Sequence, residues 1–265
     1  MSAHPTLRQW LTEAPFALGM SSGFFSFFAH AGMLSALEDE GLLPMRLSGS
    51  SAGALVGGLW ASGLPGAEIG RQLLALRRRD FWDPGPGPGL LRGRLFRRRL
   101  EALLPEPTFE GTRVPVAVSS FDLLARRTRV LDRGDLARAI CASCAVPGLF
   151  HPVWVDGRPQ LDGGVADRPG LRGMPDGVRL LFHHIASRSP WRLPGSRSMR
   201  IPDRTAMTAL VIGGLPRVHP FALPRGARAF DLARRATLAA LERPIDIAPP
   251  AHPIRTASVV LSVPA

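Results

Sequence analysis

Leu47-Ser48-Gly49-Ser50-Ser51-Ala52-Gly53-Ala54-Leu55-Val56-Gly57-Gly58 is the stretch of sequence that decides the fold. It has the pattern of a short strand, a serine between two glycines and the start of a helix. In a Gly-x-Ser-x-Gly turn the serine lies at a tight strand-to-helix corner, and the glycines avoid clashes that a Cβ would make with neighbouring backbone. The pattern predicts a nucleophile elbow formed by Gly49 and Gly53, with Ser51 as candidate nucleophile at a helix N-terminus. A glycine-rich turn that serves only packing is the alternative.

The segments on either side of this turn alternate between strand and helix. We expect an apolar strand near 16–20, a helix over 27–40, a strand ending at Ser48 and a helix after Ser51. Residues 14–37 contain no Asp, Glu, Lys or Arg and are long enough for a membrane helix, but Gly19 and the small residues 21–23 divide them into strand, turn and helix. The alternation predicts an α/β fold of three layers, with helices covering the faces of a mainly parallel central sheet.

The rest of the chain extends this pattern. A length of 265 residues with 45% hydrophobic content predicts one domain over residues 1–265. Residues 80–104 combine a Pro/Gly-rich loop with a basic amphipathic helix, which is either a lid that grips phosphate headgroups or an ordinary surface helix; we favour the surface helix. Further strands are expected over 114–119, 128–131, 153–155, 159–161 and 178–183, helices over 66–79, 135–145 and 227–241, and a surface loop over 184–205.

The composition narrows the classes of partner and cofactor. The net charge is +12, yet all 33 basic side chains are Arg and the chain contains no Lys, Asn or Tyr, a pattern typical of a GC-rich genome. We therefore expect no nucleic-acid partner. The pair Cys141 and Cys144 has no second pair to complete a zinc site, so buried thiols in a reducing cytoplasm are expected, and residues 1–13 lack the pattern of a signal peptide. No metal-ligand spacing or phosphate loop is present in the sequence, so we expect no metal and no cofactor.

A serine nucleophile needs a base, and Asp162 is the best candidate. It ends a short apolar stretch and precedes Gly163 and Gly164. Two glycines after an acid let the backbone bend sharply, so that the carboxylate can point into a site. Asp-Gly-Gly by itself is a common turn, and only its context makes the catalytic interpretation the better one.

Four linked segments together resemble the patatin-like phospholipase family of bacterial type, over about residues 14–170. They are the first helix, the elbow, the stretch before the acid, and the acid with its glycines: His30–Glu38, Gly49–Gly53, Ala142–Val153, and Asp162–Gly164 with Asp167 close behind. The resemblance implies an acyl hydrolase in which Ser51 is the nucleophile and Asp162 the general base, without a histidine. It also implies an acyl-enzyme intermediate, and acyl transfer to another alcohol would need the same groups.

One segment departs from the family pattern. The family carries a Gly-Gly-Gly-x-Arg/Lys-Gly loop whose backbone N–H groups form the oxyanion hole, whereas this chain has Met20-Ser21-Ser22-Gly23-Phe24-Phe25-Ser26-Phe27-Phe28. The basic residue is absent and Gly23 alone clearly matches. The N–H groups of Ser22, Gly23 and Phe24 are the candidate donors, and non-Gly residues resist the backbone angles that such a loop requires. Losing one oxyanion donor typically costs roughly 10²–10³ in rate.

Three functional hypotheses follow. The leading one is a serine lipid acyl hydrolase of the phospholipase A or esterase type, acting on a phospholipid or another lipid ester, with peripheral contact to a membrane surface. The second is a catalytically weak or inactive relative that binds lipid or protein through the same fold. The third is an α/β-hydrolase whose triad draws on His183, His184 or His219, although its elbow would follow only one strand and helix.

Overall fold

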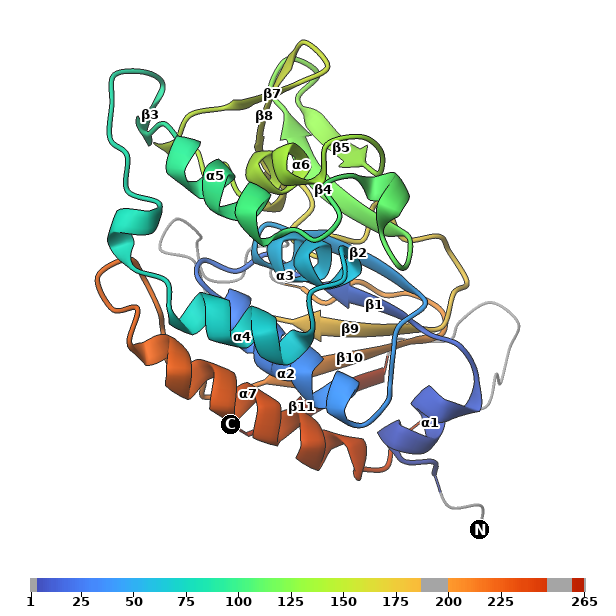
Figure 1. Cartoon of the computed structure of the whole chain (residues 1–265). Coiled ribbons are helices and arrows are strands. Elements are labelled where there is room, and N and C mark those ends of the chain that lie inside the picture. Colours follow the sequence, from blue (N-terminus) through green and yellow to red (C-terminus); the bar gives the residue numbers. More distant parts are fainter. Residues whose placement is uncertain (1–3, 187–199, 247–258, 265) are drawn as a thin grey trace.

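The computed structural model describes residues 4–186, 200–246 and 259–264, and its central feature is a nine-stranded sheet (Figure 1). The helices are α1 (Leu7–Glu13), α2 (Phe27–Asp39), α3 (Ala52–Ala61), α4 (Gly66–Leu74), α5 (Arg94–Leu103), α6 (Leu136–Ser143) and α7 (Arg225–Leu241), with 3-10 turns η1 (Arg78–Asp80), η2 (Phe109–Gly111) and η3 (Gly163–Val165). The strands are β1 (Ala17–Met20), β2 (Arg46–Ser50), β3 (Gly89–Leu91), β4 (Val116–Asp122), β5 (Arg127–Leu131), β6 (Gly148–Phe150), β7 (Val153–Val155), β8 (Arg158–Asp162), β9 (Leu180–His184), β10 (Met207–Ile212) and β11 (Val259–Val263).

The order of strands brings the ends of β2 and β8 together. The sheet runs β11-β10-β9-β1-β2-β4-β8-β7, with β5 also paired to β4. From β11 to β4 every neighbouring pair is parallel, whereas β8 and β5 are antiparallel to β4. Ser50 at the end of β2 is opposite Ser119 of β4, and Asp162 at the end of β8 is opposite Ser120. The residues that follow β2 and end β8 therefore lie at the same edge of the sheet.

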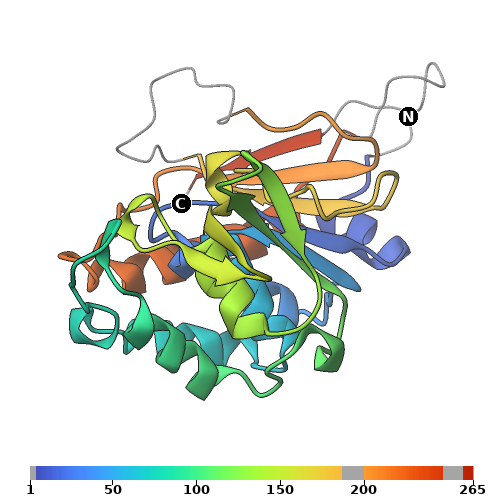
Figure 2. The ribbon, with the colours of Figure 1, turned by 90° about the horizontal axis from the view of Figure 1, so that it is seen from above.

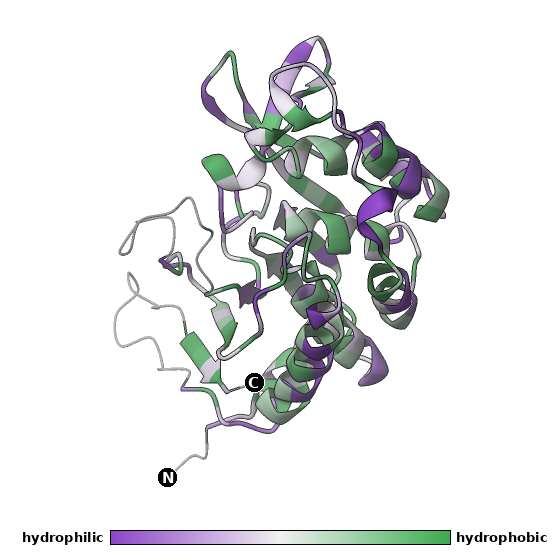
Figure 3. Cartoon of the chain, turned by 90° about the vertical axis from the view of Figure 1, so that its left-hand side faces the viewer, coloured by the Kyte–Doolittle hydropathy of each residue, from purple (hydrophilic) through white to green (hydrophobic). Residues whose placement is uncertain are grey.

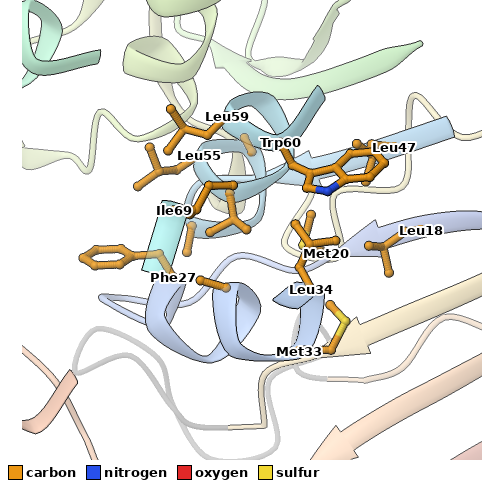
Figure 4. Close-up of a cluster of buried hydrophobic side chains, with 14 of the residues drawn as sticks. Leu18, Met20, Phe27, Met33, Leu34, Leu47, Leu55, Leu59, Trp60 and Ile69 are labelled. Atoms are coloured by element: carbon orange, nitrogen blue, oxygen red, sulfur yellow. The ribbon is translucent and has the colours of Figure 1, made fainter. Parts of the chain in front are cut away.

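The main core lies between the sheet and the helices. Helices α2, α3, α4, α6 and α7 pack side by side on one face, as the view from above shows (Figure 2). Figure 4 shows the centre of this core, where side chains of β1, α2, β2, α3 and α4 interlock: Leu18, Met20, Phe27, Met33, Leu34, Leu47, Leu55, Leu59, Trp60 and Ile69. Burial of this apolar surface is the main favourable term that fixes the strand and helix of the elbow against each other.

The second face of the sheet has a smaller apolar cluster. Leu171 and Met174, from the segment after η3, pack on Leu180, Phe182 and Met207 of the strands. Among the described residues this covering layer consists of turns rather than long helices. The predicted α/β class with a mainly parallel central sheet and flanking helices is confirmed, including the division of residues 14–37 into β1, turn and α2.

Several predicted boundaries were wrong. Helix α4 ends at Leu74 instead of Arg79, and Arg78–Asp80 forms the 3-10 turn η1. The amphipathic helix begins at Arg94, because the Asp83 carboxylate accepts hydrogen bonds from the N–H groups of Gly93 (3.0 Å) and Arg94 (2.7 Å) and so caps it. Strands β3, β6, β10 and β11 and helix α1 were not predicted, and most of the predicted 184–205 loop lies outside the described residues.

Hydrophobic residues dominate the central strands and helices, and hydrophilic residues gather on outer helical faces and loops (Figure 3). Within the described ranges, none of the helices combines the length and apolar character that crossing a bilayer requires.

Candidate active site

Ser51 occupies the corner between β2 and α3 in a backbone conformation that favours glycine. Its φ is 52° and its ψ is −114°. A Cβ at Gly49 would lie 2.6 Å from the carbonyl carbon of Gly53, and a Cβ at Gly53 would overlap the Met20 carbonyl at the end of β1. Both glycines are therefore needed for helix α3 to start this close to the strands, and the result is an elbow that presents the Ser51 side chain.

Asp162 lies against Ser51. The Ser51 hydroxyl donates to Asp162 Oδ2 at 2.6 Å, and the Gly164 N–H donates to Asp162 Oδ1 at 2.8 Å. Ser51 is 9% exposed and Asp162 5%. A Cβ at Gly163 would overlap the Ser119 carbonyl, and one at Gly164 would overlap the Ser22 side chain. The acid turn thus packs directly on β4 and on the loop after β1, and the structure brings the predicted nucleophile and base together.

Ser143 in the last turn of α6 and Cys144 at its C-cap hold the backbone of Ser51, and neither contact was predicted. The Ser51 N–H donates to Ser143 Oγ (2.7 Å), and the Ser143 hydroxyl donates to the Ser119 carbonyl (2.7 Å). The Cys144 thiol donates to the Ser51 carbonyl at 3.4 Å. Burial raises the pKa of Cys144 well above its usual value, and the nearby Asp162 carboxylate adds to the shift, so this thiol stays protonated. No local motif marks Ser143, because both of its partners come from other parts of the chain.

Asp167 has a structural role. Its carboxylate accepts a hydrogen bond from Ser119 Oγ at 2.6 Å and from the N–H groups of Gly170 (3.1 Å), Leu171 (3.3 Å) and Arg172 (3.0 Å). It is 6% exposed. These bonds tie the segment after η3 to β4, and so support the turn that carries Asp162.

The loop between β1 and α2 lies beside Ser51 and Asp162, and one of its three predicted oxyanion donors is already hydrogen bonded within the protein. The Ser22 N–H donates to the Arg168 carbonyl at 2.7 Å, so it is engaged within the protein. Gly23 and Phe24 line the cavity that also contains Ser51. Phe25 has a φ of 56°, in the region that favours glycine, and its ring packs on Phe24 and Phe81. The aromatic contacts compensate for the backbone strain at this position.

An apolar cavity of about 860 Å³, its open mouth included, adjoins Ser51. Helix α5 forms one wall with Phe96, Leu100 and Leu103. Its Arg97 forms ion pairs with Glu101 of the same helix and with Asp135 at the start of α6. The other apolar walls come from the loop after β1, α3, α4, η1 and the segment around β6: Phe24, Phe25, Phe27, Leu55, Leu59, Leu73, Leu76, Phe81, Val146, Leu149 and Phe150. A cavity with this lining fits a hydrocarbon chain.

The predicted alternative triad receives little support from the histidines. His183 is fully buried and its Nδ1 is hydrogen bonded to His30 Nδ1 at 2.9 Å. His219 lies in the segment before α7, where its Nδ1 accepts from the Phe221 N–H at 3.3 Å. His184 lies on β9 beside the Phe182 ring. The hydroxyl of Ser51 is instead bonded to a carboxylate.

Comparison with known sequences gives consistent matches. Residues 18–173 match the family described as Patatin-like phospholipase. An uncharacterized NTE family protein of Mycobacterium tuberculosis (strain ATCC 25618 / H37Rv) is 34% identical over 172 residues, which are 63% of this chain and 48% of the relative. Neuropathy target esterase sws of Drosophila grimshawi is 28% identical over 180 residues, 62% of this chain and 12% of the relative. The chain thus spans about half the length of the mycobacterial relatives it matches.

Among solved structures, VipD from Legionella pneumophila is similar, with a TM-score of 0.63 and 15% sequence identity. The match covers 86% of this chain and 66% of that chain. At this level of identity the likeness establishes the fold.

Proposed function

The chain belongs to the patatin-like phospholipase family, and from this membership we propose that it is a serine lipid acyl hydrolase of the phospholipase A or esterase type. In this proposal Ser51 is the nucleophile and Asp162 the general base. The observation that carries it is the 2.6 Å hydrogen bond from Ser51 Oγ to Asp162 Oδ2, made beside an apolar cavity.

Acylation begins with attack of Ser51 Oγ on the ester carbonyl carbon while Asp162 takes the hydroxyl proton. A carboxylate is a weak base for this task, so it must lie within hydrogen-bond reach and away from bulk water, as Asp162 does. The tetrahedral intermediate then collapses: the bond to the leaving alcohol breaks, and that oxygen receives the proton from Asp162. The acyl group remains on Ser51.

Deacylation repeats these steps with water. Asp162 takes a proton from a water molecule that attacks the acyl carbonyl, the bond to Ser51 Oγ breaks, and the proton returns to the serine. The products are the free fatty acid and the restored dyad. An alcohol in place of water would give acyl transfer instead.

The oxyanion of both intermediates needs backbone donors. We assign this role to the N–H of Gly23 together with the N-terminal N–H groups of α3, beginning at Ala52; Phe24 N–H remains a candidate donor. Gly23 and Ala52 line the cavity beside Ser51, and the positive end of the α3 dipole points at the same place.

A fluorophosphonate tests the proposal directly. We expect it to add one phosphonyl group to the wild-type chain, on Ser51, because the dyad activates that hydroxyl. Intact-mass and peptide mass spectrometry measure the adduct, and Ser62→Ala, which removes a buried serine on the C-cap of α3, is the matched control. An unmodified Ser51 in a folded protein, together with no hydrolysis of phospholipids or short esters, would exclude the serine hydrolase.

We also propose that the cavity mouth contacts an anionic phospholipid surface. Next to the cavity residue Phe81, the Trp82 ring packs on Phe221 with centroids 5.9 Å apart, and the Arg78 guanidinium lies 5.1 Å from the Phe221 ring. Phe221 is 68% exposed. Figure 1 shows η1 and the segment before α7 side by side at the left edge. An exposed phenylalanine ring and a half-buried tryptophan ring beside an arginine suit the headgroup level of a bilayer, where apolar rings enter and the guanidinium meets phosphate.

The double substitution Trp82→Ala and Phe221→Ala tests this contact. We expect binding to vesicles of phosphatidylglycerol and phosphatidylcholine to weaken about tenfold or more, because each lost ring removes about 1.5–3 kcal/mol of burial. Hydrolysis of a soluble short-chain ester should not change. Trp154→Ala removes a comparably exposed ring on β7 and serves as the control. Equal vesicle binding by the double variant and the wild type would contradict the assigned surface.

A further inference from the structure

A pair of buried histidines that the mechanism does not use lies behind the loop that carries Gly23. His30 of α2 and His183 of β9 are both fully buried, with Nδ1 atoms 2.9 Å apart and rings at 88°. His30 Nε2 is 2.8 Å from the carbonyl oxygen of Ser21. The pair therefore connects β9 to the first residue after β1.

The hydrogen-bond partners assign every proton of this pair. A carbonyl can only accept, so His30 Nε2 carries the proton that it donates to Ser21. Because burial keeps both rings neutral, His30 Nδ1 is an acceptor, and the donor to it is the Nδ1–H of His183. His183 Nε2 is left unprotonated, and within the described residues it has no hydrogen-bond partner. Both rings are neutral, and the chain of donation runs in one direction, from His183 through His30 to the Ser21 carbonyl.

Charge and burial maintain this neutral state. Burial lowers the pKa of His30 to about 4. The hydrogen bond to the Ser21 carbonyl acts in the opposite direction and is outweighed, and Arg168 and His184 add to the lowering. The pKa of His183 is lowered for the same reason, with His30 and His184 adding to it. The neutral relay is consequently the form present near neutral pH.

The carbonyl, the N–H and the side-chain oxygen of Ser21 each make a hydrogen bond. Besides the bond from His30 to its carbonyl, its N–H donates to the His183 carbonyl (3.2 Å) and its Oγ accepts from the Ile185 N–H (2.9 Å). The next residue, Ser22, donates its N–H to the Arg168 carbonyl, and the Arg168 guanidinium donates to the Ile185 carbonyl. Gly23 follows immediately, so the anchors on Ser21 and Ser22 determine where its N–H lies.

We propose that His30 is a positioning residue of the oxyanion hole. It fixes the Ser21 carbonyl, and through it the Gly23 N–H beside Ser51, in a chain whose loop lacks the glycine-rich sequence and its basic residue. This inference rests on the proposed serine hydrolase function and adds to it the group that holds the donor loop in place. His183 supports His30 by donating to its Nδ1, and Arg168 anchors the same loop from the segment after η3.

Substitutions at His30 separate positioning from packing. His30→Met removes the donor to Ser21 but keeps a large apolar side chain, and His30→Gln keeps an N–H donor that reaches the same carbonyl without titrating. With a soluble p-nitrophenyl ester we expect His30→Met to lower kcat by roughly 10- to 100-fold with little change in KM. His30→Gln should recover most of that loss. His4→Gln, at an exposed histidine, is the control.

Two ligands supply a readout that a general loosening of the fold would not give. An alkyl trifluoromethyl ketone forms a tetrahedral adduct with an active serine and carries the oxyanion, whereas a free fatty acid only fills the cavity. We expect the ketone to lose affinity in parallel with kcat in His30→Met, while the affinity for the fatty acid stays the same. If His30→Met does not fold, His183→Met, which leaves the bond to Ser21 but removes its support, should show the same pattern with a smaller loss.

The outcomes distinguish this inference from the function on which it rests. Suppose that the wild type is active and that His30→Met is folded. If this variant keeps its kcat, or loses kcat and fatty-acid affinity equally, the positioning role is overturned and the proposed function is not. A wild-type protein that neither hydrolyses the ester nor reacts with a fluorophosphonate at Ser51 overturns the proposed function, and the positioning role with it.

Discussion

Asp162→Asn is expected to lower kcat for ester hydrolysis by about 10²–10⁴-fold and to leave KM nearly unchanged. The amide has the same shape and can still accept the Gly164 N–H with its oxygen, so the turn should be retained. The group that faces Ser51 Oγ would then be an NH₂ donor, which cannot take the serine proton. Steady-state kinetics with a soluble ester and with phospholipid vesicles measure the loss.

Asp167→Asn is the matched control, because it changes the next buried carboxylate of the same segment. Asp167 accepts from Ser119 Oγ and three backbone N–H groups and does not contact Ser51. Its substitution should lower the free energy of unfolding by roughly 1–3 kcal/mol, the usual range for bonds to a charged group. The folded fraction should keep its kcat. A wild-type kcat in Asp162→Asn, or an equal loss in both variants, would contradict the assignment of Asp162 as the base.

Ser51→Gly and Ser51→Ala are both expected to lower kcat by at least about 10⁴-fold, since both remove the nucleophile. Their stabilities should differ. Ser51 has φ 52° and ψ −114°, a conformation that costs a residue with a Cβ about 1–3 kcal/mol and glycine very little. Glycine also makes the unfolded chain more flexible, which offsets up to about 1 kcal/mol of that difference.

We therefore expect Ser51→Gly to be more stable than Ser51→Ala by about 1 kcal/mol in urea unfolding monitored by circular dichroism. Both variants lose the hydroxyl that pairs with Asp162, so the comparison isolates the backbone strain of the elbow. Equal stability would mean that the strain at the corner does not exceed the roughly 1 kcal/mol by which glycine loosens the unfolded chain. A kcat in either variant within about tenfold of the wild-type value would argue against Ser51 as nucleophile.

The central part of the fold could be predicted because its signals are local. The run from β1 to α3 alternates apolar strands and helices, and Gly49 and Gly53 mark the corner where backbone atoms approach most closely. The Asp-Gly-Gly turn likewise contains both its acid and the glycines that let it pack on β4. These are positions where residue type and backbone geometry are tied within a few residues.

The remaining parts of the site depend on partners that are distant in sequence. Ser143 looks like any small helix residue until the fold places it between the Ser51 N–H and the Ser119 carbonyl. The prediction that the Ser22 N–H donates to the oxyanion was wrong, because this N–H donates to the carbonyl oxygen of Arg168, which lies far along the chain. The same reason explains why the relay of His30 and His183 was not foreseen: its members are 153 residues apart.

A predicted helix boundary was wrong where a side chain from another segment caps the helix. The hydrophobic stripe of α5 extends back to Leu91, but the Asp83 carboxylate caps the helix at Gly93, and Leu91 instead pairs with Phe150 in a two-stranded sheet. Strand β10 and the edge strand β11 are short apolar segments, and their pairing with β9 and with each other identifies them as strands.

In the proposed mechanism, the antiparallel pairing of β8 with β4 determines when the protein can first hydrolyse an ester during its synthesis. A ribosome releases the β1-α2-β2-α3 unit early, so the nucleophile emerges with its elbow, whereas its base is encoded 111 residues later. Until β8 has emerged and paired, Ser51 has no partner to accept its proton. In the proposed mechanism the nascent chain therefore cannot attack lipid esters before β8 has emerged and paired with β4, and ester hydrolysis begins only after this long-range step of folding.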